Sequence, residues 1–326
     1  MSIFKLLKFD DVDISNLQNV DEMTVVPLLG ATRGEVAKPQ NLVFSKTSNY
    51  GEMVFENQDE DCDAIIPSNL MVRGKDAQDH VMSHIGLLEP QTSRRFPDSC
   101  CIEESQGGYL ENSEKNEFDI LPIELRKCFL TKDFRENRQY DKLWGGILDW
   151  LKDLPLKYKG VAHLRYFYDD PVVKTQLETF AAEFEPVEDQ IGAVILFSGI
   201  PMGIEIMPSP EYWDYYWKLL IRGSYGAELI RLKQLGQIQT FKQSLPRIND
   251  HMDLDHMKEQ MEDYIVQIQN YVPDVLKKVR IESQLSVSPQ IIGESKTLQV
   301  EYLKTQDGGG EMITQNQKPI YLSLVL

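Results

Sequence analysis

The chain has 326 residues, 42% of them hydrophobic and 26% charged, which is enough to bury a full core in one large or two smaller domains. Its 51 acidic and 34 basic residues give a formal net charge of −17. This charge repels nucleic-acid phosphates and anionic lipid, so it disfavours both as main partners. A local pocket for a small anion is still compatible with four basic residues that lie close together in sequence: Arg73, Lys75, Arg94 and Arg95.

The cellular compartment is indicated by the N-terminus and the cysteines. MSIFKLLKFDDVD soon turns acidic and contains no apolar run long enough for a signal peptide. No run approaches the roughly 18 apolar residues that span a bilayer, so we expect a cytosolic protein. The four cysteines form neither a CxxC pair nor a zinc-site spacing, and reduced thiols are expected: Cys62, Cys100, Cys101 and Cys128.

Short strands are predicted for the first third of the chain. Five apolar or alternating runs, bounded by Gly, Pro, Asn and acidic residues, have this pattern: 23–29, 51–57, 64–72, 80–88 and 99–104. The following residues, 105–117, are polar and show no periodicity. They are the best candidate for a mobile loop.

Two helices are predicted in the middle of the chain. From Tyr140, apolar residues recur at spacings of three and four, and Pro155 stops the pattern. Asp170 is typical of a helix cap and Pro171 of a first helical position. This second helix should end before Pro186.

The run 190–207 is the strongest strand signal in the sequence. Two apolar segments joined by Ser198-Gly199 predict a hairpin whose first strand is central and covered on both faces. Ser209 and Pro210 then predict a helix, and a further helix is expected at 253–270. The buried stripe of the helix after Ser209 should consist of Trp213, Tyr216, Trp217 and Leu220.

The chain closes with a predicted terminal hairpin, in which Gly308-Gly309-Gly310 forms the turn between TLQVEYL and PIYLSLVL. Strands and helices do not alternate regularly, which favours an α+β fold with a β-rich N-terminal half and helices packed on a central hairpin. The expected organisation is a β-rich half at 1–109, a loop and helical connector at 110–160 and an α+β half at 161–326. Together they should form one composite domain over about 20–326.

Several short words occur in a recognisable order. The first three are Gln78-Asp79-His80, LLEP at 87–90 and Cys101-Ile102-Glu103. They are followed by YDKLW at 140–144, QIGAVI at 190–195, MGIEIM at 202–207, YWKLLIRGSYGAEL at 216–229 and Gly293-Glu294. Over roughly residues 50 to 326, this set resembles a bacterial domain associated with ADP-ribosyl glycohydrolase and rhodanese-phosphatase genes.

The resemblance implies a setting in NAD or ADP-ribose metabolism, often in prokaryotic antiviral defence, and it implies no defined reaction. The family word Gln-Asn-Arg is changed here, with Asp79 in place of Asn and His80 in place of Arg. Tyr140 replaces a Gln, and the Trp that follows the Cys-Val-Glu word is missing. Because a neutral His holds a phosphate poorly, the change at His80 weakens a phosphate-binding role.

These words predict a pocket near 73–80 and 101–103. If the strand that contains Gln78 pairs with the strand that contains Cys101, their polar side chains converge, and a carboxylate beside an imidazole allows general acid or base chemistry. The candidate catalytic residues are Asp79, His80 and Glu103. The candidate ligand-binding residues are Arg73, Lys75, Gln78, Cys101 and Trp144. The competing interpretation is a strand end whose polar face holds a turn together.

Other motifs favour structural roles. His80 and His84, four residues apart, have no evident third ligand, and His251 and His256 are better explained by an exposed helix start, so no metal site or defined cofactor is predicted. A buried, inert thiol is a better explanation of Cys101 than a nucleophile. The aromatic stripe from Tyr212 to Trp217 could stack on a base, but helix packing is its default explanation.

Two classes of function are compatible with the sequence. The first is a binder or enzyme of a nucleotide-type small molecule such as NAD or ADP-ribose. The second is a protein–protein interaction or structural subunit of a defence or stress complex, without catalytic activity. Retention of Gln78, Glu103 and Trp144 together favours the first class.

Overall fold

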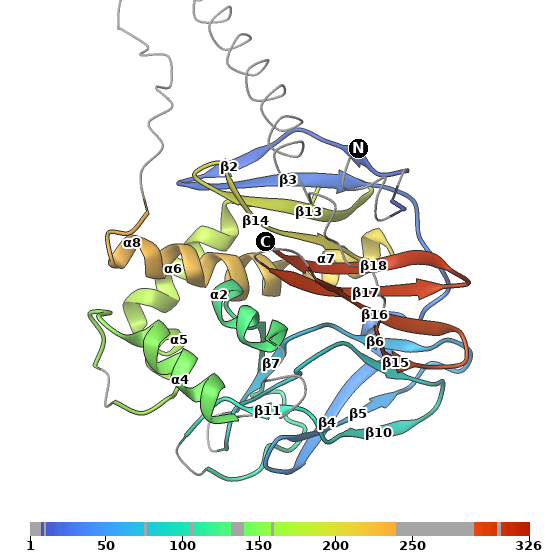
Figure 1. Cartoon of the computed structure of the whole chain (residues 1–326), viewed down its shortest axis with the longest axis horizontal. Coiled ribbons are helices and arrows are strands. Elements are labelled where there is room, and N and C mark those ends of the chain that lie inside the picture. Colours follow the sequence, from blue (N-terminus) through green and yellow to red (C-terminus); the bar gives the residue numbers. More distant parts are fainter. Residues whose placement is uncertain are drawn as a thin grey trace, which may run out of the picture.

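The computed structural model describes residues 8–9, 11–74, 77–104, 107–131, 140–157, 160–238, 290–304 and 308–326. It shows an α+β fold with a β-rich N-terminal half and C-terminal strands, as the sequence predicts (Figure 1). Within these ranges, no helix is long and apolar enough to cross a membrane. The predicted helix at 253–270, with His251 and His256, lies outside them.

A large antiparallel sheet joins the two ends of the chain. In the described residues it has nine strands, in the order β1-β3-β13-β14-β18-β17-β16-β15, with β2 beside β3. Its strands are β1 (Asp13–Ile14), β2 (Gln18–Val20), β3 (Met23–Leu29), β13 (Gln190–Phe197), β14 (Ile200–Ile206), β15 (Gln290–Glu294), β16 (Leu298–Lys304), β17 (Gly309–Gln315) and β18 (Lys318–Val325). The N-terminal β3 pairs with β13, so early and late segments share one sheet.

The predicted hairpin at 190–207 is confirmed. Every residue of β13 is buried, and the strand lies between β3 and β14. Ile195 belongs to the core on one face of the sheet and Val194 to the core on the other, which is the double covering expected of a continuously apolar strand. Ser198 and Gly199 both have positive φ, as a two-residue hairpin turn requires.

The predicted turn at Gly308-Gly309-Gly310 is wrong. Gly309 and Gly310 lie within β17, and the turn to β18 is made by Asn316 and Gln317, whose φ values are 52° and 64°. A Cβ on Gly310 would collide with the carbonyl oxygen of Ser323 on β18. These glycines therefore allow a close approach of backbones inside the sheet instead of a reversal of the chain.

Three smaller sheets lie beside the large one and are built from the N-terminal half. They have the strand orders β10-β5-β4, β11-β8-β7-β12 and β6-β9. Their strands are β4 (Leu42–Asn49), β5 (Glu52–Asn57), β6 (Ala64–Ile66), β7 (Leu70–Arg73), β8 (His80–Val81), β9 (Gly86–Leu88), β10 (Ser93–Phe96), β11 (Cys100–Cys101) and β12 (Glu117–Ile120).

Two of the predicted strands are each divided into two. The run 64–72 breaks between β6 and β7, because Pro67 lacks a backbone donor and Asn69 has a φ of 57°. The run 80–88 bends at Ser83 and His84, between β8 and β9. In the polar segment 105–117, residues 105 and 106 lie outside the described residues, and Glu117 already belongs to β12.

The helices cover the sheets and connect them. They are η1 (Pro39–Asn41), α2 (Ile123–Arg126), η2 (Lys127–Leu130), α4 (Tyr140–Leu151), α5 (Arg165–Tyr168), α6 (Pro171–Ala182), α7 (Pro210–Lys218), η3 (Leu219–Gly226) and α8 (Ala227–Gln234). Two predicted caps are confirmed, since Asp170 accepts hydrogen bonds from the backbone of α6 and Ser209 accepts one from Tyr212 on α7.

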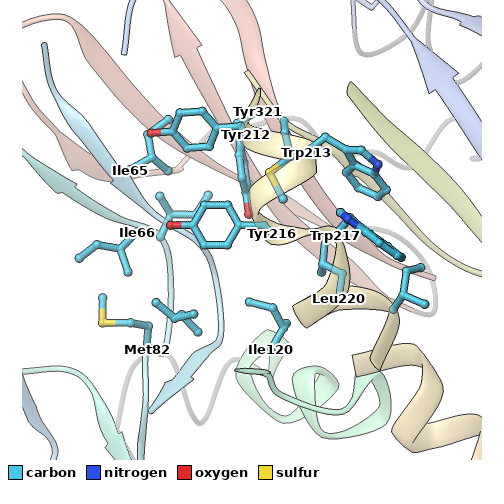
Figure 2. Packing of buried hydrophobic residues seen from close by; sticks show 14 of the residues in the cluster. Ile65, Ile66, Met82, Ile120, Tyr212, Trp213, Tyr216, Trp217, Leu220 and Tyr321 are labelled. Atoms are coloured by element: carbon cyan, nitrogen blue, oxygen red, sulfur yellow. The ribbon is translucent and has the colours of Figure 1, made fainter. Parts of the chain in front are cut away.

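The aromatic stripe of α7 is buried in the main core. Trp213, Tyr216 and Trp217 are each at most 6% exposed. Figure 2 shows the ring of Tyr216 directed toward Ile66, and Trp213 and Trp217 on the opposite side. The Tyr212 hydroxyl donates to the carbonyl of Ala37 at 2.6 Å. Packing is therefore the role that the structure gives to this stripe.

After α7 the chain widens into the π-helix η3, which contacts two buried charge networks. Arg222 donates to Asp119, which also accepts from Arg73 at 2.9 Å. Three residues later, the hydroxyl of Tyr225 donates to Glu205 at 2.8 Å, and Glu205 also accepts from Arg126 at 2.7 Å. η3 thus links β12 to the large sheet through charged hydrogen bonds.

Gly223 is the position of closest approach in η3. A Cβ there would lie 2.7 Å from Asp119 Oδ1 and 2.9 Å from Asp119 Cβ. We expect Gly223→Ala to destabilise the fold by about 1–3 kcal/mol, because the carboxylate would have to leave its two arginines. The matched control is Gly145→Ala, where nothing lies within 4 Å of the new Cβ, and the expected change is at most about 1 kcal/mol of added stability. Urea unfolding measures both, and equal effects would contradict the prediction.

Candidate functional site

The pairing of β8 with β11 brings two of the sequence words together. Cys101 lies opposite His80, and the Ile102 amide donates to the Asp79 carbonyl at 3.0 Å. The side-chain amide nitrogen of Gln78, Nε2, donates to the Glu103 backbone carbonyl at 3.1 Å. These polar residues are buried, so the strand pairing gathers the predicted side chains into the protein interior.

Two further residues belong to this cluster: His163, just before α5, and Arg165, the first residue of α5. Glu103 and His163 form an isolated antiparallel bridge, and Arg165 reaches back to the Asp79 carboxylate. Arg165 Nε donates to Asp79 Oδ2 at 2.8 Å, and Arg165 Nη2 donates to Asp79 Oδ1. The same Nη2 also donates to the carbonyls of Gly74 and of Ala77, the latter at 2.8 Å. Arg165 therefore fixes the whole turn that leads into β8.

The charge state of Asp79 depends on its contacts with Arg165. The Asp79 side chain is 1% exposed. Burial raises its pKa above the usual value, and the hydrogen bonds and charge of Arg165 oppose that rise. Burial by itself would lower the pKa of Arg165, but Asp79 more than compensates and the pKa is raised. The pair is best described as a buried bidentate salt bridge.

Within this cluster, the two ring nitrogens of His163 have different surroundings. Its Nδ1 lies 3.4 Å from Glu103 Oε1, and a carboxylate only accepts, so the ring proton belongs on Nδ1. Its Nε2 is buried and has no hydrogen-bond partner among the described residues. A neutral imidazole that is oriented by a carboxylate and carries an uncommitted lone pair can act as a general base.

Asp79, Glu103 and His163 also form a candidate metal cluster, with one ligand atom of each within 4.8 Å of the others. One nitrogen and two carboxylates suit several divalent metals. However, Arg165 already occupies both oxygens of Asp79 with positive charge. The donor set therefore fits a metal poorly, and a site without a metal stays our prediction.

His80, a candidate catalytic residue, has both ring nitrogens engaged with the backbone. Nδ1 lies 2.9 Å from the Gln78 carbonyl, and Nε2 accepts from the Gly51 amide at 3.2 Å. The ring is fully buried, which lowers its pKa below the usual 6.5. These contacts give His80 a structural role, and they leave neither nitrogen for a metal shared with His84.

Cys101 and Trp144 also make backbone contacts. The Cys101 thiol donates to the Glu103 carbonyl at 3.0 Å, and burial raises its pKa to about 12. So high a pKa leaves almost no thiolate, which agrees with an inert thiol. The Trp144 indole donates to the Cys101 carbonyl at 3.0 Å and thereby ties α4 to β11. All four cysteines are free thiols.

The basic residues are not one pocket. Arg73 on β7 pairs with Glu117 at 2.7 Å and with Asp119, and it lies over the ring of Tyr168. Arg94 and Arg95 belong to another sheet, on β10, where they contact the Leu87 carbonyl and Glu52 respectively. Lys75 lies outside the described residues.

Sequence reasoning missed His163 and Arg165. They lie in the stretch HLRYFYDD, which has no Gly, no recognisable spacing and no resemblance to the family words. The available signal was weak: His163 is one of five histidines in a chain whose other histidines all lie in segments already considered.

Acid sensitivity is the first prediction from the site. Since burial depresses the pKa of His80, the unfolded state binds more protons than the folded state in the window just below pH 6.5, so stability falls as pH falls. The contribution is at most about 1.4 kcal/mol per pH unit. His80→Gln keeps a polar side chain but cannot titrate, and its unfolding free energy should fall less steeply between pH 7 and pH 5. Parallel curves would contradict this.

The second prediction concerns the Asp79–Arg165 salt bridge. Arg165→Met leaves the Asp79 carboxylate buried without its charge partner, and we expect a loss of about 3–5 kcal/mol. Adding Asp79→Asn should recover most of that loss, because no uncompensated charge then remains. Denaturant unfolding of both single variants and the double variant gives the coupling. Additive effects would show that the two residues do not act as a pair.

The comparisons with known proteins agree with the resemblance seen in the sequence. A search of curated proteins and a search of solved structures gave no match. One family model, the ARG and Rhodanese-Phosphatase-superfamily-associated Protein domain, matches residues 11–303. This range begins and ends earlier than the expected 50–326. Because the match includes most of the described strands, and the β8–β11 cluster with His163 and Arg165, the chain belongs to the ARG and Rhodanese-Phosphatase-superfamily-associated Protein domain family.

Proposed function

We propose that this protein binds a ribose-containing small molecule of the NAD or ADP-ribose class at Asp79, Glu103 and His163, and that His163 acts there as a general base. The observation that carries the proposal is the His163 ring, with Nδ1 3.4 Å from Glu103 and a buried Nε2 that has no hydrogen-bond partner among the described residues. A buried nitrogen without a hydrogen-bond partner costs free energy. Such a nitrogen is expected where a bound ligand supplies the missing donor.

Charge favours the sugar over the phosphates. The carboxylates of Asp79 and Glu103 and the guanidinium of Arg165 give the cluster a net negative charge, which repels a phosphate. Ribose hydroxyls are donors, and they suit the carboxylate oxygens and the His163 lone pair. Gln78, held at the Glu103 carbonyl, lies within the same cluster and is expected to help orient the sugar.

His163 and Glu103 together could carry out proton transfer. His163 Nε2 would take a proton from a bound hydroxyl or water, and Glu103 would stabilise the resulting imidazolium through Nδ1. Such a base typically contributes a factor of about 10²–10⁴ in rate. Asp79 is held by Arg165, so its part would be to accept a hydrogen bond and not to transfer a proton.

The family supports the ligand class. Its name associates the domain with ADP-ribosyl glycohydrolase and rhodanese-phosphatase proteins, which fits an accessory role beside ADP-ribose enzymes. A part in prokaryotic antiviral defence belongs to the same proposal, and its support is the gene setting that the resemblance implies.

Ligand-dependent stability tests the proposal. Purified protein is heated with ADP-ribose, NAD, ATP or a divalent metal, and a ligand at about a hundred times its dissociation constant should add roughly 2.7 kcal/mol. For a domain of this size the midpoint rises by a few degrees. We expect the shift with ADP-ribose or NAD, and we expect His163→Gln and Glu103→Gln to abolish it.

The matched control is Glu114→Gln, which removes the same charge from an exposed position and should keep the shift. A shift that survives His163→Gln in a folded variant would move the ligand away from this cluster. No shift with any compound would overturn the proposal and favour the alternative, a protein–protein interaction or structural subunit without catalytic activity.

A further inference from the structure

A second polar relay lies beyond the other end of β8, in the bend before β9. Ser83 Oγ lies 2.8 Å from His84 Nδ1, and His84 Nε2 lies 2.7 Å from Asp98 Oδ2. Asp98 comes from the turn between β10 and β11, so the three residues meet only in the folded chain. A hydroxyl, an imidazole and a carboxylate are thus joined in one line of hydrogen bonds.

The partners define the proton positions. Asp98 only accepts, so the imidazole proton belongs on Nε2, and Nδ1 is left to accept the proton of the Ser83 hydroxyl. This is the arrangement that raises the nucleophilicity of a serine, with the two ring nitrogens exchanged relative to the chymotrypsin template. The exchange does not alter the chemistry, because the imidazole still relays a proton between hydroxyl and substrate.

A cationic group lies in the same place. Ser83 lines a small cavity of about 20 Å³ together with Arg126, Asn69 and Ser323. The Arg126 side chain is 2% exposed, and its Nε has no partner among the described residues. A buried guanidinium with a free donor can stabilise an oxygen that becomes negative during a reaction.

We propose that Ser83, His84 and Asp98 form an acyl-transfer centre that hydrolyses small carboxylic esters, with Arg126 as the group that stabilises the oxyanion. The cavity has room for about one water-sized group, which favours the smallest acyl parts, such as formyl or acetyl. This centre is separate from the Asp79–Glu103–His163 cluster, and it does not depend on the function proposed for that cluster.

The reaction needs only water as co-reactant. Ser83 Oγ bonds to the ester carbonyl carbon while its proton passes to His84 Nδ1, and Asp98 balances the imidazolium. The carbon–alkoxy bond then breaks, and the leaving alkoxide takes the proton from His84. Water next attacks the acyl carbon and gives a proton to His84; the bond to Ser83 breaks, and Ser83 recovers that proton. No group is oxidised or reduced.

The test combines covalent labelling with turnover on the full chain. A fluorophosphonate probe should add one phosphonyl group, which intact-mass and peptide mass spectrometry should place on Ser83. Hydrolysis of p-nitrophenyl acetate should be saturable. Ser83→Ala should remove the label, and His84→Gln and Asp98→Asn should slow labelling and hydrolysis by a factor of about 100 or more. The control is Ser93→Ala, an exposed serine on β10 that should change neither.

Unfolding temperatures of all variants are measured in parallel, so that loss of folding is not mistaken for loss of chemistry. His84→Gln keeps a hydrogen-bonding side chain but lacks a basic nitrogen, which separates proton transfer from a role in holding the bend. If folded wild-type protein takes up no label at Ser83, or if His84→Gln labels at the wild-type rate, the relay only ties the bend to the β10–β11 turn and the proposal is overturned.

Discussion

The salt bridge between Asp79 and Arg165 is the interaction on which the candidate site depends. A carboxylate that is 1% exposed cannot stay charged without a partner, and Arg165 supplies one from a distant segment of the chain. By bonding also to the carbonyls of Gly74 and Ala77, Arg165 holds the turn into β8. His163, two residues before Arg165, is thereby placed against Glu103. His163 is thus positioned by a charge pair that takes no part in the proposed proton transfer.

Buried carboxylates with charged partners also occur elsewhere in the interior. Asp119 is fully buried between Arg73 and Arg222, and Glu205 lies between Arg126 and Tyr225. Buried charges of this kind add little net stability compared with apolar packing, but removing one partner is costly. They therefore penalise alternative arrangements of η3, β12 and the large sheet. In an α+β fold without a regular repeat, such penalties help to select one packing of the layers.

How far the sequence could predict this fold depends on the range over which each signal acts. The turn at Ser198-Gly199 and the caps at Asp170 and Ser209 are local, because the side chain and the backbone that it bonds are a few residues apart. Gly309 and Gly310 do not form the predicted turn, because their need for small size comes from the neighbouring strands β16 and β18, which the local pattern does not show. Likewise, the bend at Ser83 interrupts a run whose apolar composition alone indicates one strand.

The site was predictable to the same degree. The convergence of Gln78 and Asp79 with Glu103 followed from one strand pairing, and the structure contains that pairing. His163 was out of reach, since only the completed fold brings it to Glu103.

The partners of three histidines explain why residue type alone could not assign their roles. Both ring nitrogens of His80 contact the backbone, and burial lowers its pKa and so favours its neutral form, which suits a structural role. His84 lies between a hydroxyl and a carboxylate, so a proton can move through it. His163 has a carboxylate on one nitrogen and no described partner on the other. The number and kind of contacts at the second nitrogen therefore separate an imidazole that holds the fold from one that is available for chemistry.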